Sequence, residues 1–291
     1  MKWELLNYNH EYIQKKSSEF QTDNLITKLL LNRGITDKED VKRFLSPSVD
    51  DINNPFLFED MEKVVERIIE ARKNKEKVFI YGDYDVDGIS GTAYLIIVLR
   101  NLGINIDYFI QNRVHEGPKV NKHFISYIKK RNAKLVVTVD TSFGTTEEME
   151  LLTKHGIDLI ITDHHRQTNK VKTNINTINP KISNKYPFKH LSGSGVAYKL
   201  ADAVYEKLGV NKKILYDYME IVMIGTVADV VPMTDENRFI IKQGLANLKK
   251  TRVKGLEYLI VYLKLNGHII NTSDIGFYIA PMLNALGRID S

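Results

Sequence analysis

Hydrophobic residues in the middle of the chain form short runs, which are separated by longer segments of helical period. Four runs rich in β-branched or aromatic residues predict strands, and INTINP from residue 175 is consistent with a fifth. The four runs are KVFIYG from residue 77, NIDYFI from 105, KLVVTV from 134 and IDLIIT from 157. Helical spacing is found between them at 91–103, 121–132 and 145–156. This alternation is typical of βαβ units, so we predict an α/β fold with a parallel sheet and flanking helices.

The two ends of the chain have a different pattern, because apolar residues recur there only at helical spacing. Helices are predicted before the first strand at 22–35, 36–47 and 59–77, and after residue 190 at 193–209, 213–231, 237–250 and 255–267. Thr36 is the expected N-cap of the second helix and Pro47 its stop. We therefore divide the chain into an N-terminal helical segment at 1–55, an α/β domain at 56–235 and a helical connector at 236–291.

Acidic and imidazole side chains follow three of the predicted strands, at the point where each strand ends. In open α/β sheets, ligands bind beyond the carboxyl ends of the strands, so these side chains are expected to converge. They are Asp83, Asp85 and Asp87 after the first strand, Asp140 after the third, and Asp163, His164 and His165 after the fourth.

Five carboxylates this close repel one another unless cations lie among them. Two divalent ions would neutralise four of the five charges, and carboxylates with imidazole suit Mn²⁺ or Mg²⁺, with Zn²⁺ as a further option. Asp229 lies in the apolar stretch MIGTVADVVPM. A buried carboxylate needs a metal, a cation or hydrogen bonds, and we interpret Asp229 as another metal ligand.

The composition restricts the class of protein and its partners. With 291 residues, 43% of them hydrophobic, the chain fits one large domain or two small ones. Its net charge of +5 agrees with a polyanionic partner, but equally with a lysine-rich surface. The longest apolar run, AYLIIVL, is too short to span a membrane, the N-terminus lacks a signal-peptide core, and there is no cysteine. We therefore expect a cytoplasmic protein without a membrane partner.

Other structures can produce parts of this pattern. The spacing DxDxDG occurs in calcium loops, but such a loop needs glutamate at its last position, which is Tyr94 here. The stretch DHH alone can be a helix cap with a satisfied core histidine, and Gly193 and Gly195 can simply mark a tight helix start. Dinucleotide binding is not supported, because acids at the end of the first strand would repel a pyrophosphate. The combination of three strand-end clusters favours a metal site.

The order of these motifs resembles the DHH phosphoesterase superfamily and, within it, the RecJ-type single-strand-specific exonucleases. The matching stretches are YGDYDVDGISGTA, VTVD, GIDLIITDHH, NP at 179–180, LSGSGVAYKL, IGTVADVVPMTDENR and PMLNALGR. The stretch GTVADVVP followed by ENR, together with Asp83, is similar to the RecJ type rather than to superfamily members that act on pyrophosphate or small nucleotides.

The resemblance implies a role for each acid and histidine. Six residues are implied to hold two ions: Asp83 and Asp85 the first, Asp87, His164 and Asp229 the second, and Asp140 both. His165 is implied to face the phosphate and Asp163 to support the histidines, so His165, Asp140 and Asp163 are the expected catalytic residues.

The implied activity is metal-assisted hydrolysis of phosphodiester bonds, in which 5′-phosphorylated single-stranded DNA is degraded from 5′ to 3′ with two Mn²⁺ or Mg²⁺ ions. The implied partners are single-stranded DNA and a single-strand-binding protein or a helicase. The residues expected to contact nucleic acid are Arg113, Ser194, Gly195, Asn284 and Arg288. Two alternatives stay open: a phosphodiesterase of short oligonucleotides or cyclic dinucleotides, and a nucleic-acid-binding remnant without catalysis.

The chain departs from the RecJ-type pattern in several places. The segment after Asp140 reads DTSFGTT, and Pro118 and Lys119 replace the end of a glycine-tyrosine-glycine turn. Pro281-Met282 stands where the family has proline-arginine, so one phosphate contact is expected to be lost. The chain also ends before the DHH-associated domain and the OB-fold of the family, and both are expected to be absent.

Overall fold

The computed structural model describes residues 7–111, 122–141, 146–166 and 175–285. The chain forms two compact units, Met1–Ile52 and Asn53–Ser291. The helices of the first unit are α1 (His10–Phe20), α2 (Asn24–Asn32), α3 (Lys38–Leu45) and a 3₁₀ turn, η1 (Val49–Asp51). Its core consists of Ile13, Phe20, Leu30, Leu31 and Val41. The predicted boundary at 235/236 within the second unit stays a prediction.

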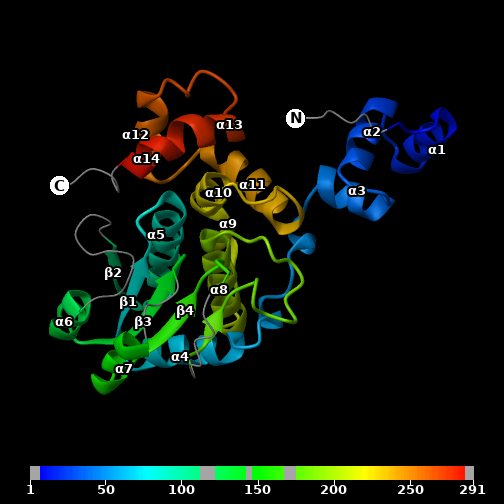
Figure 1. Ribbon diagram of the computed structural model, residues 1–291. Coiled ribbons are helices and arrows are strands. Elements are labelled where there is room, and N and C mark those ends of the chain that lie inside the picture. The colour runs from blue at the N-terminus through cyan, green and yellow to red at the C-terminus, as the bar shows by residue number, and fades with distance from the viewer. Residues whose placement is uncertain (1–6, 112–121, 142–145, 167–174, 286–291) are drawn as a thin grey trace. The chain divides into compact units, whose positions relative to one another are not determined.

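A parallel sheet forms the centre of the second unit, as predicted (Figure 1). The strand order is β2-β1-β3-β4-β5, and all neighbouring strands are parallel. The strands are β1 (Lys77–Gly82), β2 (Asn105–Ile110), β3 (Ala133–Val139), β4 (Asp158–Thr162) and β5 (Thr177–Ile178). The three strands that are followed by predicted ligands, β1, β3 and β4, are adjacent, which brings their carboxyl ends together.

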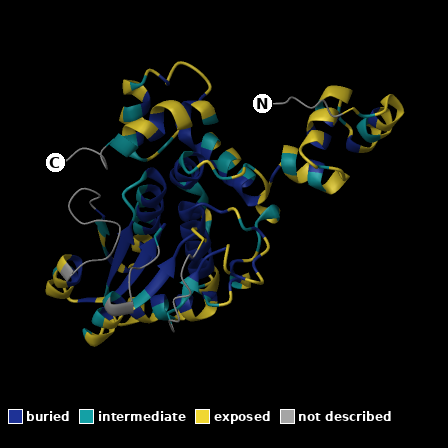
Figure 2. Ribbon diagram, viewed as in Figure 1, coloured by how far each residue is buried: buried dark blue, intermediate teal, exposed yellow. Residues whose placement is uncertain are grey.

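Helices cover both faces of this sheet (Figure 1). One face contacts α5 (Val86–Asn101) and α8 (Gly193–Lys207), and the other packs against α6 (Lys122–Lys130) and α7 (Thr146–Lys154). Phe79 and Tyr81 of β1 join the core with α6 and α7, so the alternate residues Val78 and Ile80, which are also buried, point to the opposite face. The central strands β1 and β3 are mostly buried, whereas the edge strand β2 is largely half-buried or exposed (Figure 2). Burial on both faces explains why the central strands appear in the sequence as continuous apolar runs.

The hydrogen bonds of the sheet extend one residue beyond three strand ends. The amides of Asp83, Asp140 and Asp163 donate, each at 3.1 Å, to the carbonyls of Val139, Thr162 and Ile178. The first acid after each of β1, β3 and β4 is therefore held in register by the neighbouring strand.

Three predicted helices differ from the observed ones. The N-cap of α3 is Asp37 rather than Thr36, because the Asp37 carboxylate accepts a hydrogen bond from the amide of Asp40 at 2.9 Å. The helix predicted from residue 91 begins earlier, at Val86, and so carries acids in its first turn. The helix predicted at 213–231 is two helices, α9 (Lys213–Asp217) and α10 (Met219–Ala228), which are separated at Tyr218.

The described C-terminal part is helical, but not only where the pattern predicts helices. The remaining helices of the second unit are η2 (Pro55–Leu57), α4 (Met61–Lys73), α11 (Asp235–Leu248), α12 (Lys254–Tyr262), α13 (Thr272–Asp274), the π-helix η3 (Ile275–Ile279) and α14 (Ala280–Ala285). The last three lie in the segment predicted as a helical connector, but the pattern did not place them individually, because Gly276 and Pro281 are usual breakers. The π-helix ends just before Pro281, whose ring and missing N–H disturb an α-helical ladder. No described helix has the length and apolarity that a membrane span requires.

A buried ion pair connects α8 to the start of α11. The side chains of Lys199 and Glu236 are fully buried, and Nζ lies 2.9 Å from Oε2. Lys199 also donates to the carbonyl of Asn53, while Glu236 Oε1 accepts from Asn53 Nδ2 at 2.7 Å and from the Tyr186 hydroxyl at 2.6 Å. Each charge is thus compensated in the interior, and removal of one partner leaves the other charge buried alone.

We predict that Lys199→Met lowers the free energy of unfolding by about 3–5 kcal/mol, because Glu236 loses its cation in a dry environment. Denaturant unfolding measures this loss. The matched control is Lys254→Met, since Lys254 pairs with Glu257 at the surface, where the two side chains are 82% and 53% exposed. The control should lose less than about 1 kcal/mol, and an equally small loss for Lys199→Met would contradict the prediction.

Candidate metal centre

The start of α5 carries two of the predicted acids. Asp85 is the N-cap, and its carboxylate accepts a hydrogen bond from the amide of Gly88 at 3.0 Å. Asp87 lies in the first turn and is 1% exposed. Its carboxylate oxygens accept from the amides of Gly193 at 2.6 Å and Ser194 at 3.0 Å, at the start of α8. The N-terminus of α8 therefore stabilises the negative charge of Asp87.

The predicted metal ligands gather in one place. In the part of the chain that the structure describes, three sets of side chains could each hold an ion, because the ligand atoms of each set lie within 4.8 Å of one another. The sets are Asp83, Asp85 and Asp140; Asp87, His164 and Asp229; and Asp140, His164 and His165. Asp140 and His164 each belong to two sets, so neighbouring ions would share ligands.

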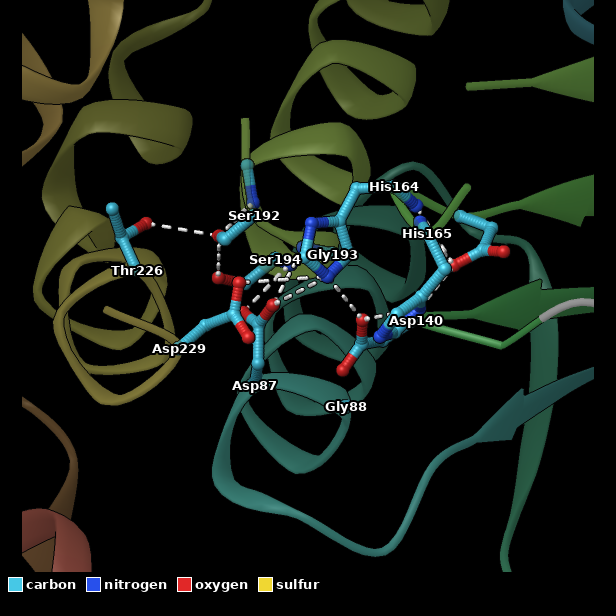
Figure 3. A network of polar contacts seen from close by, with 12 residues as sticks. Asp87, Gly88, Asp140, His164, His165, Ser192, Gly193, Ser194, Thr226 and Asp229 are labelled. Atoms are coloured by element: carbon cyan, nitrogen blue, oxygen red, sulfur yellow. Dashed lines mark hydrogen bonds and ion pairs between the residues drawn. The ribbon is translucent and has the colours of Figure 1, made fainter. Parts of the chain in front are cut away.

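The imidazole of His164 lies among three carboxylates, with Asp87 and Asp229 on one side and Asp140 on the other (Figure 3). Nε2 is 3.1 Å from Asp140 Oδ1, 3.5 Å from Asp229 Oδ2 and 3.9 Å from Asp87 Oδ2. Burial, reinforced by the neighbouring His165, lowers the pKa of His164 to about 4, so the ring is neutral at neutral pH.

Several buried atoms of this cluster lack a hydrogen-bond partner. Within the described part of the chain, neither ring nitrogen of His164 nor Oδ1 of Asp140 has one. Buried polar atoms are normally satisfied, and a cation among these atoms would satisfy them. Carboxylate oxygens with imidazole nitrogen form a donor set that suits Mn²⁺ or Mg²⁺. The residues therefore fit a divalent metal ion.

Burial and mutual repulsion raise the pKa of four acids in the cluster. Burial is the largest cause for each, and neighbouring carboxylates add to it. The pKa of Asp83 is raised to about 6 and that of Asp229 to about 7. The pKa values of Asp87 and Asp140 are also raised. The folded chain thus disfavours the negative charges that a bound cation would compensate.

Asp163 fixes the orientation of His165. Its Oδ1 accepts from the amides of His164 and His165 at 2.8 and 3.1 Å and lies 2.8 Å from Nδ1 of His165. Burial opposes ionisation of Asp163, but its hydrogen bonds with His165 outweigh burial and lower its pKa, while the same side-chain bond raises the pKa of His165. Because Nδ1 is engaged, Nε2 is the ring nitrogen that could meet a substrate, and the His165 side chain is 58% exposed.

Two glycines allow helices to approach the acids closely. A Cβ atom at Gly193 would lie 2.5 Å from Asp140 Oδ1, and one at Gly225 would lie 2.5 Å from Asp87 Oδ1. Sequence reasoning missed this role. The motifs LSGSG and IGTVAD contain both glycines, but neither shows which side chain approaches the backbone.

Ser194 and Gly195 do not lie at the surface, where a contact with nucleic acid was expected. Both are buried in the first turn of α8, and Ser194 Oγ donates to the carbonyl of Val222 at 3.1 Å. Ser192 is the N-cap and accepts from the amide of Gly195 at 3.1 Å. The glycines thus mark a tight helix start. Ser194 contacts the cluster through the hydrogen bond that its backbone N–H donates to the Asp87 carboxylate.

Asn284 lies beside the cluster, across a cavity of about 570 Å³. The cavity is lined by Asp85, Asp87 and Asp229 and by residues of η3 and α14, including Asn284. A molecule bound at the acids could therefore reach Asn284. Two basic residues expected to contact nucleic acid, Arg113 and Arg288, fall outside the described residues.

A family model described as the DHH family, N-terminal domain, matches residues 77–226, more than half of the chain. The match begins at β1 and ends within α10, so it includes every predicted metal ligand except Asp229. The chain belongs to the DHH family.

Within this family, the chain is similar to proteins described as single-stranded-DNA-specific exonuclease RecJ. The relative from Bacillus subtilis is 36% identical over 100% of this chain, and the one from Haemophilus influenzae is 31% identical over 92%. The chain spans 36% and 48% of their lengths. A crystal structure of RecJ in complex with Mn²⁺ from Thermus thermophilus matches 98% of this chain and 40% of its own, with a TM-score of 0.82 and 26% identity.

The raised pKa of Asp229 predicts how stability changes with pH when no metal is present. An acid whose pKa is raised from 3.8 to about 7 on folding favours the folded state at low pH, and this contribution is lost as pH rises through 7. Asp229→Asn lacks this titrating group. With a chelator present, its melting temperature relative to that of the wild type should therefore rise between pH 3.8 and about pH 7.

Asp163→Asn supplies the contrast, because the pKa of Asp163 is lowered on folding. At pH values above the pKa of Asp163 in the unfolded chain, its ionised form stabilises the folded state. This contribution is lost as the pH falls through the pKa of Asp163 in the folded state. The melting temperature of Asp163→Asn relative to the wild type should therefore fall with rising pH. The same trend in both variants would contradict the assignment of the two shifts.

Proposed function

We propose that this chain is the catalytic part of a metal-dependent nuclease that removes nucleotides from single-stranded DNA in the 5′ to 3′ direction. The observation that carries the proposal is the convergence of acids and histidines into overlapping ligand sets that share Asp140 and His164. The similarity to RecJ proteins and the Mn²⁺ in a solved relative support the choice of substrate and ion. When bound, two Mn²⁺ or Mg²⁺ ions would lower the pKa of a water molecule and neutralise charge on the phosphate.

The ligand sets suggest how the acids share this work. Asp83 and Asp85 would hold one ion together with Asp140, while Asp87, His164 and Asp229 would hold the other. Asp140 would bridge the two, since its Oδ1 lies 3.1 Å from Nε2 of His164 and its ligand atom also falls within the Asp83 set. Its backbone has a φ of 59°, a region that aspartate tolerates better than most residues.

His165 would bind the phosphate rather than a metal ion. Asp163 holds Nδ1 and raises the pKa of the ring, which favours a protonated imidazole with Nε2–H directed to a phosphate oxygen or to the leaving oxygen. The alternative is a ligand role, because His165 also belongs to a set with Asp140 and His164.

The substrate would enter through the cavity between the acids and α14, where Asn284 could donate a hydrogen bond to it. A single-strand-binding protein or a helicase would supply single-stranded DNA. This part of the proposal rests on the resemblance of the sequence motifs alone.

The function is tested by incubating the chain with a 5′-phosphorylated, 3′-labelled single strand in Mn²⁺. We expect stepwise shortening, and we expect Asp140→Ala to reduce turnover by more than about a hundredfold and by more than Asp83→Ala, because a bridging residue holds both ions. Faster turnover of dinucleotides than of strands would favour a small-substrate phosphodiesterase. Strand binding without turnover would favour a non-catalytic protein.

The role of His165 is tested by separating metal content from turnover. His165→Ala should keep its Mn²⁺, measured by elemental analysis after removal of free metal, and lose turnover by about a hundredfold or more. His10→Ala, which removes an exposed histidine of the first unit, should change neither quantity. If His165→Ala loses one metal equivalent, His165 is a ligand and not the phosphate contact.

A further inference from the structure

Two chemically different groups of residues line the cavity beside the acids. The acidic lining consists of Asp85, Asp87 and Asp229. The rest is apolar apart from Asn284 and consists mainly of Val86, Val227, Val230, Ala280, Pro281 and Ala285. Its volume of about 570 Å³ is typical of sites for small molecules. No lysine, arginine or histidine is among the described residues that line it.

These two groups of residues suit different parts of a nucleotide. A phosphate is bound most strongly by cations, and among the described lining residues only the acids could hold cations, as metal ions. The apolar lining has no charged group for a phosphate and only the Asn284 amide as a side-chain donor, but it would bury the faces of a nucleobase favourably. A nucleotide with its phosphate at the acids would therefore place its base or sugar against the apolar lining.

Val230, which belongs to the apolar lining, has an unusual backbone conformation. It follows the C-cap of α10, and its φ of 58° lies in the left-handed region. Glycine or asparagine is usual at this position, and a β-branched residue is strained there. Of the described residues with positive φ, Val230 is the only β-branched one.

The side chain of Val230 gains no packing that would offset this strain, because it is 83% exposed. Residues kept in strained conformations are concentrated at functional sites, where the conformation serves the ligand. Val230 directly follows Asp229, and both line the cavity, so the same backbone turn that presents the carboxylate also places an apolar residue at the cavity.

We propose that the apolar lining of the cavity binds the nucleobase of the nucleotide whose phosphate lies at the acids, with Val230 as the residue that the base packs against. This inference rests on the proposed function for the position of the phosphate. Val230 would determine affinity for the base rather than the chemical step. Since its contact is apolar and Asn284 offers a single amide, the site would accept all four bases with little preference.

The test compares two probes that differ only in the base, dAMP and 2-deoxyribose 5-phosphate, by calorimetric titration in Mn²⁺. The wild-type chain should bind dAMP about tenfold more tightly than 2-deoxyribose 5-phosphate, because only dAMP has a base that buries apolar surface. Val230→Asn tolerates positive φ but removes the apolar branch. Because it relieves the strain at this φ, it should keep or raise the melting temperature. It should also keep its affinity for deoxyribose 5-phosphate and lose most of the preference for dAMP.

The control is Val261→Asn, which replaces a 54% exposed valine of α12 that does not line this cavity. It should leave both affinities unchanged. Equal wild-type affinities for the two probes, or no measurable binding of either, would overturn the proposal. So would a Val230→Asn variant that keeps the full preference, or one that melts earlier and loses both probes, since Val230 would then serve only the fold.

Hydrolysis of a single strand, measured on the same samples, separates this inference from the proposed function. Hydrolysis without discrimination between the probes leaves the nuclease proposal standing and rejects the base site. Discrimination without hydrolysis of any strand supports the base site and rejects the nuclease.

Discussion

Repulsion among buried carboxylates is the constraint on which the rest of this structure depends. Asp87 and Asp140 are almost fully buried, and Asp83 and Asp229 lie close enough to add to the repulsion. The fold offsets part of this cost with backbone amides, as the start of α8 does for Asp87. It also accepts glycine at positions where any side chain would collide with a carboxylate. What remains is a set of unsatisfied oxygen and nitrogen atoms around His164, which is the condition that a divalent cation relieves.

The sheet and most of the candidate site could be predicted from the sequence, because both depend on local signals. Strands buried on both faces produce continuous apolar runs, and the strands after which the acids occur are neighbours. The ends of parallel strands share one edge, so the position of Asp140 or His164 after its own strand is enough to predict convergence. Asp229 belongs to a helix end instead, and only its apolar surroundings indicated that it needed a partner.

The sequence could not predict features that depend on which segments pack together. The first turn of α8 contains small residues that suit a phosphate contact as well as a buried helix start, and only the position of Asp87 decides between them. Thr36 and Asp37 are both good caps, and the choice depends on which side chain reaches the amide of Asp40. The segment from Thr272 to Ala285 contains glycine and proline, yet it is helical because a capping box at Asn271 starts it and the π-helix accommodates Pro281.

The hydrogen bonds of the sheet continue to the first acid after β1, β3 and β4, and this affects which metal ion the site can hold. Since the amides of Asp83, Asp140 and Asp163 are bonded to the neighbouring strands, the spacing of their Cα atoms is set by the sheet and not by the ligand. Of these three residues, Asp83 and Asp140 are the proposed ligands, and they can adapt to an ion only through their side-chain torsions. Ca²⁺ requires more oxygen ligands at longer distances than Mg²⁺, and a frame that cannot widen offers it few of them. A rigid sheet edge would therefore favour a small ion such as Mg²⁺ over Ca²⁺. This selectivity arises from the backbone, although no backbone atom needs to touch the metal.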